Sequence, residues 1–199
     1  MKLHSIALAL ACASLSHSAS AQSAPTHPPL ESVEALELSR YLGTWYQVAL
    51  YPNSFQSQCV SDTTATYRGR TDGAIEVVNR CRNARGDFDE AIGVARPTGA
   101  LDGGTLRPAQ LEVTFLPAWL RWAQSFGHWG WGAYWVIQLA PDYRYTVVSE
   151  GSREYLWVLS RTSALAADDE ASIRGRLREQ GFDLARLRMH LQGKATPTP

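Results

Sequence analysis

Side chains able to do acid–base, nucleophilic or metal chemistry are few in this sequence, and they are scattered. An enzyme needs a nucleophile with an adjacent base, paired carboxylates in a cleft, or a set of metal ligands. After the first 21 residues the only histidines are His27, His128 and His190, and their spacing indicates no site. One histidine in a loop, such as His128, is weak evidence for haem. We therefore expect no catalytic residues, no metal and no cofactor, as in a binding protein.

Cys59 and Cys81 flank a segment that is typical of a β-hairpin. Residues 70–73, Arg-Thr-Asp-Gly, have turn chemistry, and both flanks are rich in β-forming residues. Strands at those ends would bring the two thiols near each other. A disulfide is the default in an oxidising compartment, whereas a metal site would need clustered histidines and a catalytic thiol would need a base nearby in sequence.

The first 21 residues are typical of a secretory signal peptide. Lys2 is followed by an apolar stretch and then by Ala19-x-Ala21, a cleavage pattern for signal peptidase. The mature chain would begin at Gln22, with residues 22–35 as a flexible lead. The alternative is a lipoprotein signal that ends at Cys12. We expect export to the periplasm or secretion, with outer-membrane association through a lipid on Cys12 as the alternative.

Composition and charge limit the partners. The 19 basic and 19 acidic residues balance, and 45% of the residues are hydrophobic, which argues against disorder and against nucleic acid as a partner. No run of eighteen apolar residues follows the N-terminus. Seven Trp, eight Tyr and five Phe favour sheets with an apolar interior.

Strand signals recur at short intervals, separated by Gly, Pro, Asp or Asn. We predict strands over residues 43–50, 60–68, 74–81, 87–95, 110–116, 134–139, 143–149 and 155–160. A helix follows, with Asp168 as its cap, Ile173 and Leu177 as an apolar i, i+4 pair and Gly181 as its stop. This order predicts an all-β fold, an eight-stranded antiparallel up-and-down β-barrel with a C-terminal α-helix.

Three stretches carry a resemblance to a known family. Residues 43–46 (GTWY), 141–145 (PDYRY) and 155–161 (YLWVLSR) resemble, in order and spacing, the three sequence signatures of the lipocalins. The chain is most similar to the bacterial outer-membrane lipocalins and to apolipoprotein D. The resemblance implies a lipocalin domain over residues 36–192, followed by a disordered tail over residues 193–199.

The resemblance also implies how the barrel closes. Trp45 would close the narrow end, and Arg161 would lie across its ring in a cation–π contact that joins the first strand to the last. The alternative is an arginine free in solvent beside an ordinary core tryptophan. Because side chains alternate along a strand, Gln47 and Ala49 would share the inward face of Trp45.

Alternation and the family alignment together give the expected lumen. The expected ligand-binding residues are Ala65, Tyr67, Val77, Asn79, Leu111, Val113, Phe115, Tyr134, Val136, Tyr155 and Trp157. A barrel of eight strands is either filled by its own side chains or holds one small ligand. Small residues favour a cavity here, namely Ala49, Ala65, Ala91, Gly93 and Ala95.

The expected ligand is a small hydrophobic molecule, a fatty acid or lysophospholipid, bound for storage or transport at the cell envelope. Asn79, Tyr67, Tyr134 and Tyr155 would contact its polar group near the mouth. The alternative function is that of a lipocalin-fold enzyme acting on a bound lipid, since some relatives carry out isomerase or epoxide chemistry. We expect a monomer or weak dimer.

The segment from Leu116 to Gly132 holds much of the aromatic excess. It includes Trp119, Trp122, Trp129 and Trp131 beside Arg121 and His128. Such a segment either covers the barrel's own apolar surface or contacts a membrane surface and gates ligand entry.

Overall fold

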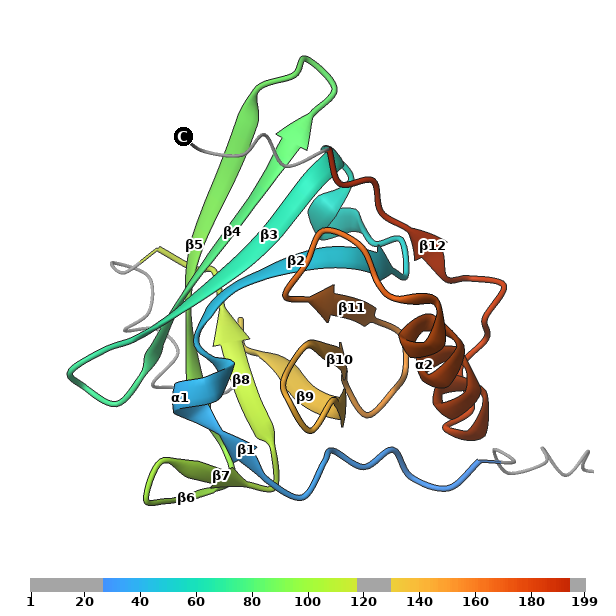
Figure 1. The fold of residues 1–199 in the computed structure, drawn as a ribbon. Coiled ribbons are helices and arrows are strands. Elements are labelled where there is room, and N and C mark those ends of the chain that lie inside the picture. Colours follow the sequence, from blue (N-terminus) through green and yellow to red (C-terminus); the bar gives the residue numbers. More distant parts are fainter. Residues whose placement is uncertain (1–26, 118–129, 194–199) are drawn as a thin grey trace, which may run out of the picture.

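A meander of antiparallel strands closes on itself in the structure, a computed structural model that describes residues 27–117 and 130–193 (Figure 1). In the main sheet each of the eight barrel strands pairs with the next barrel strand along the chain, and the last also pairs with the first. Closure pairs the two edges of the sheet with each other. The predicted eight-stranded antiparallel barrel is therefore confirmed.

The barrel strands lie where the apolar alternation predicts them, within a few residues. They are β2 (Gly43–Leu50), β3 (Cys59–Gly69), β4 (Ile75–Asn83), β5 (Phe88–Pro97), β8 (Gln110–Thr114), β9 (Gly132–Leu139), β10 (Tyr145–Ser149) and β11 (Leu156–Ser160). The strand predicted from Tyr143 begins two residues later, because Tyr143 has a φ of 64°, which belongs to a turn. Cys59 and Cys81 form the expected disulfide between β3 and β4, with their Cα atoms 5.5 Å apart.

Short elements that the pattern does not predict cover the narrow end of the barrel. A small sheet of β1 (Leu36–Glu37), β7 (Thr105–Arg107) and β6 (Ala100–Asp102) lies at the base in Figure 1, next to helix α1 (Leu38–Tyr41). Leu36 pairs with Leu106, and both side chains are fully buried. Their apolar side chains join the core inside the barrel.

The chain before β1 is described from His27, which includes part of the lead expected over residues 22–35. Leu30 is buried, and the Val33 amide donates to the Val136 carbonyl at 2.7 Å. The Ala109 amide donates to the Val33 carbonyl at 3.1 Å. This part of the lead is therefore held against the barrel by backbone hydrogen bonds.

Helix α2 (Ala167–Glu179) packs on the outside of the barrel over a second apolar core (Figure 1). Ile173 and Leu177 are buried there, as the i, i+4 spacing predicts, and Gly181 follows the helix with a φ of 81°. The predicted cap is wrong: Ala166 is the N-cap residue, and Asp168 lies inside the first turn. In that position its negative charge interacts favourably with the positive N-terminal end of the helix dipole.

The C-terminal segment inserts between β2 and β3. These two strands pair only from Gly43 to Tyr46, and beyond that point β12 (Arg188–Met189) pairs with β2. The His190 amide donates to the Val48 carbonyl, and the Asp62 amide donates to the Leu191 carbonyl, both at 2.9 Å. The segment thus supplies hydrogen bonds that the diverging strands cannot make to each other. Residues 194–199, most of the expected tail, lie outside the described residues.

Among residues 27–117 and 130–193, no helix has the length and apolar character needed to cross a membrane.

Candidate ligand-binding site

The narrow end of the barrel is closed by Trp45 and Arg161. The guanidinium carbon of Arg161 lies 3.7 Å from the centre of the fully buried Trp45 ring, so the expected cation–π contact is present. The guanidinium also donates to four backbone carbonyls, those of Arg40 (2.7 Å), Tyr41 (3.2 Å), Leu42 (2.9 Å) and Thr44 (2.9 Å). Arg161, which directly follows the last barrel strand, therefore joins that strand to Trp45 and to the backbone at the start of the first barrel strand.

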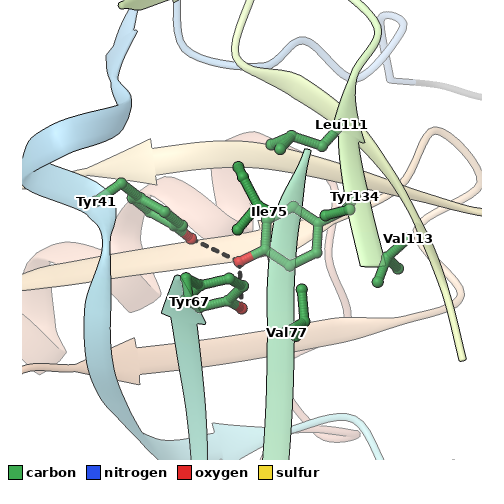
Figure 2. A pocket seen from close by; sticks show the side chains of 8 residues that line it. Tyr41, Tyr67, Ile75, Val77, Leu111, Val113 and Tyr134 are labelled. Carbon is green, nitrogen blue, oxygen red and sulfur yellow. Dashed lines mark hydrogen bonds between the residues drawn. The ribbon is translucent and has the colours of Figure 1, made fainter. Parts of the chain in front are cut away.

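Three tyrosines meet directly above this floor (Figure 2). The ring of Tyr41, at the end of α1, lies 5.1 Å from that of Trp45. Its hydroxyl is 2.6 Å from the Tyr134 hydroxyl, which is 2.8 Å from that of Tyr67. Three phenols from α1, β3 and β9 thus form one hydrogen-bonded chain, which we call the tyrosine network.

The position of this network corrects the expected location of two residues. Tyr67 and Tyr134 were expected near the mouth, but Tyr67 pairs with Gly43, the first residue of β2, at the closed end. Because β3 runs from the mouth to the floor, a residue near its end lies deep in the barrel. Tyr41 was missed because it precedes the first predicted strand, where no period-2 alternation marks it.

Burial strongly disfavours ionisation of the network. Desolvation raises the pKa of Tyr41 to about 12, against the lowering effect of its hydrogen bond to Tyr134. Desolvation, then the neighbouring Tyr41 and Tyr67, hold the pKa of Tyr134 well above its usual value. The pKa of Tyr67 is likewise raised, first by burial and then by Tyr41. The network is therefore a neutral chain of hydroxyls at ordinary pH.

We expect folding stability to fall as pH rises above about 10, where phenols of the unfolded chain ionise. The phenols of the folded network stay protonated there, so ionisation stabilises only the unfolded state. The contribution of the network to folding stability is therefore complete below about pH 10 and decreases above it. Absorbance at 295 nm should show at least three of the eight tyrosines ionising above about pH 11 in folded protein but near pH 10 in denaturant. Ionisation of all eight together in the folded protein would contradict this.

The space left beside the network is small. It is lined by Tyr41, Tyr67, Ile75, Val77, Ala95, Leu111, Val113 and Tyr134, and it measures about 10 Å³. Figure 2 shows the aliphatic members arranged around the three phenols. A cavity of this size holds about one water molecule. The lower lumen is therefore packed by its own side chains.

Two of the small residues expected to leave a cavity do not leave one. A Cβ atom on Gly93 would lie 2.8 Å from ring carbons of Phe115, so the Phe115 ring occupies that space. Ala49 points away from the lumen, because a bulge shifts the β2–β11 register so that Ala49 pairs with Val158 in the outer core. The alternation from Trp45 therefore holds for Gln47 and fails at Ala49.

The other expected lumen residues lie on the inner face. Those buried in the inner core are Ala65, Tyr67, Val77, Leu111 and Val136, and those partly buried against it are Val113, Tyr134 and Trp157. Asn79 pairs with Ala65 and so shares its face. Phe115 and Tyr155 lie higher, toward the mouth.

Aromatic side chains form the rim of the mouth. The Tyr155 ring is 6.0 Å from that of Trp157 and 5.0 Å from that of Phe55, which lies in the short helix η1 (Ser54–Gln56). Phe55 is 59% exposed and Phe115 is 41% exposed. Phe55 was missed because it lies in the loop between two predicted strands.

The tryptophan-rich segment is described only at its ends. The guanidinium carbon of Arg96 lies 4.1 Å from the centre of the Trp131 ring, and Arg96 forms an ion pair with Glu112 at 2.8 Å. Trp119, Arg121, Trp122, His128 and Trp129 lie outside the described residues. Membrane contact through Leu116 to Gly132 therefore stays a prediction.

Within the described part of the chain, no three His, Cys, Asp or Glu side chains gather where they would hold a metal ion. The described histidine of the C-terminal segment, His190, instead meets the Thr63 hydroxyl at 2.7 Å between β2 and β3. That contact fastens the segment to the barrel.

The fold and lumen define a protein with one closed β-barrel, an apolar interior and one mouth lined by aromatic rings. A family model described as the lipocalin-like domain matches residues 36–192. The chain belongs to the lipocalin family, whose members bind small hydrophobic ligands.

Relatives agree with this assignment. Temperature-induced lipocalin-1 of Arabidopsis thaliana is 32% identical over 171 residues, covering 84% of this chain and 86% of the relative. Outer membrane lipoprotein Blc of Escherichia coli K12 is 34% identical over 167 residues, covering 83% and 85%. Insecticyanin of the tobacco hornworm Manduca sexta shares the fold, with a TM-score of 0.61 at 15% identity, over 85% of this chain and 87% of that one.

Proposed function

We propose that this protein binds a fatty acid or a lysophospholipid in the barrel lumen, for storage or transport at the cell envelope. The observation that carries the proposal is an inner face of aliphatic and aromatic side chains below a rim of exposed rings. Apolar walls with few polar groups are typical of sites for hydrophobic ligands. No observation on the described residues favours the enzyme alternative.

The proposed location is outside the cytoplasm. The Cys59–Cys81 disulfide fits an oxidising compartment, and the relative in Escherichia coli is named an outer membrane lipoprotein. We infer processing after Ala21, with lipid attachment at Cys12 as the alternative. The intact mass of the exported protein distinguishes the two, because only the second adds acyl chains, which a Cys12→Ser change would remove.

Direct binding tests the proposed function. Mature protein is purified gently, bound lipid is extracted and identified by native mass spectrometry, and the delipidated protein is titrated with palmitate and with palmitoyl lysophosphatidylcholine. We expect one ligand per chain. Absence of lipid in the native spectrum together with no saturable binding of either compound would contradict the proposal.

Ligand binding in the lower lumen requires side chains of the inner face to move, because the cavity beside the tyrosine network holds about one water. Phe115 is well placed to move, since its ring is 41% exposed and fills the space above Gly93. We expect Phe115→Ala to raise the affinity for palmitate about fivefold, because about 1 kcal/mol is then no longer spent on displacing the ring.

A matched control for this variant is Phe88→Ala. Phe88 is similarly exposed, at 42%, but it lies on the outer face under the guanidinium groups of Arg80 and Arg82. Its replacement should leave the affinity for palmitate unchanged. A lower affinity in Phe115→Ala, with its fold intact, would show that the ring contacts the ligand instead of blocking it.

A further inference from the structure

Two glutamine side chains and one indole form a chain of hydrogen bonds inside the barrel near its mouth. The Trp157 indole nitrogen donates to Gln56 Oε1 at 2.8 Å, and Gln56 Nε2 donates to Gln47 Oε1 at 2.9 Å. Gln47 pairs with Leu159, which belongs to the inner core, so its side chain shares the lumen face with Trp45. We call these three residues the amide relay.

The direction of the relay is determined by chemistry. An indole N–H can only donate, so the Gln56 atom that faces it is the oxygen. Gln56 therefore presents its NH₂ group to Gln47, and the Gln47 atom that receives it is also an oxygen. Rotating either amide by 180° would place two donors or two acceptors against each other. The remaining group, Gln47 Nε2, is consequently a donor.

Among the described residues this donor has no hydrogen-bond partner, and Gln47 is only 3% exposed. Buried polar groups are nearly always satisfied in native proteins, because an unmade hydrogen bond in a dry environment is costly. A buried amide on the inner face of the barrel with an unused N–H is a polar group that can take an acceptor from a ligand.

We propose that the Gln47 amide binds the ester carbonyl of an acyl lipid held in the lumen. This inference rests on the proposed function and selects among its ligands. The buried polar side chains of the described residues are neutral except Asp169, which pairs with Arg144 under helix α2. Arg161 already donates to four backbone carbonyls.

A carboxylate at Gln47 would therefore be buried without a compensating cation, which is strongly unfavourable. A neutral carbonyl oxygen accepts the same hydrogen bond without that cost. The relay thus favours an ester-linked lysophospholipid over a free fatty acid at this depth. A fatty acid would keep its carboxylate nearer to the water at the mouth.

The test compares two lysophosphatidylcholines with the same head group and chain length, one with an ester-linked palmitoyl chain and one with an ether-linked hexadecyl chain. Only the first has a carbonyl. We expect the wild-type protein to bind the ester about tenfold more tightly, the change that corresponds to about 1.4 kcal/mol. In Gln47→Leu the two affinities should become equal, at the value of the ether in the wild type.

Two further variants make the test specific. Gln110→Leu makes the same chemical change on a residue whose strand partner, Trp135, packs in the outer core, and it should keep the tenfold preference. Gln47→Met replaces the amide by an unbranched side chain of similar size and serves if Gln47→Leu does not fold. Thermal melting verifies each fold.

A spectroscopic readout is independent of affinity. With a ¹³C-labelled ester carbonyl, the infrared stretching band should shift to lower frequency in the wild-type complex and not in the Gln47→Leu complex. Equal affinity for ester and ether in the wild type, or a preference that persists in Gln47→Leu, would overturn the inference and leave the proposed function standing. Failure of both lysolipids and palmitate to bind the wild type would overturn both.

Discussion

Replacing Arg161 by alanine is expected to lower the free energy of unfolding by about 3 kcal/mol. The cation–π contact with Trp45 accounts for about 1–2 kcal/mol, since the ring is fully buried and the guanidinium is partly exposed. The rest comes from hydrogen bonds to the carbonyls of residues 40–42 and 44, which would lose a charged donor. Urea unfolding of mature protein measures the change.

Two controls separate these contributions. Arg161→Lys keeps the charge but not the planar group that contacts several carbonyls at once, so we expect an intermediate loss. Arg68→Ala removes an arginine from an exposed ion pair with Glu76 and should cost less than about 1 kcal/mol.

Ligand affinity is the second readout for Arg161→Ala. Because Arg161 lies at the floor, affinity measured under folding conditions should change far less than stability. Unchanged stability with a collapse of affinity would mean that the inner face of the barrel has been assigned incorrectly.

Loss of the Cys59–Cys81 disulfide is expected to have a comparable effect. The bond closes a loop with a sequence separation of 22 residues. Restricting the unfolded chain in this way contributes about 3 kcal/mol in the chain-entropy model. The double variant Cys59→Ser, Cys81→Ser should unfold at correspondingly lower urea concentration.

Reduction provides the matched control for this variant. Wild-type protein in excess reductant should unfold like the double variant, because both lack the cross-link, and the double variant should not respond to reductant. Equal stability of oxidised and reduced wild type would show that β3 and β4 hold the two ends together without the covalent bond.

The sequence by itself determined the eight barrel strands and helix α2, because these elements depend on local signals. Alternating apolar residues between turns specify strands, and Ile173 with Leu177 specify the buried side of a helix. The lipocalin signatures placed Trp45 and Arg161 together across 116 positions of sequence, since the contact that closes the barrel accompanies the fold. The cysteine pair followed from its hairpin in the same way.

The tertiary structure alone decided how deep each inward residue lies and which polar groups meet. Alternation gives the face of a side chain but not its height, so Tyr67 and Tyr134 were placed at the mouth and lie at the floor. A single bulge in β2 sends Ala49 to the outer core, because one extra residue reverses the alternation. The tyrosine network and the amide relay join residues from separate strands, loops and helices. Such contacts arise only when the sheet closes and brings distant segments to the same level.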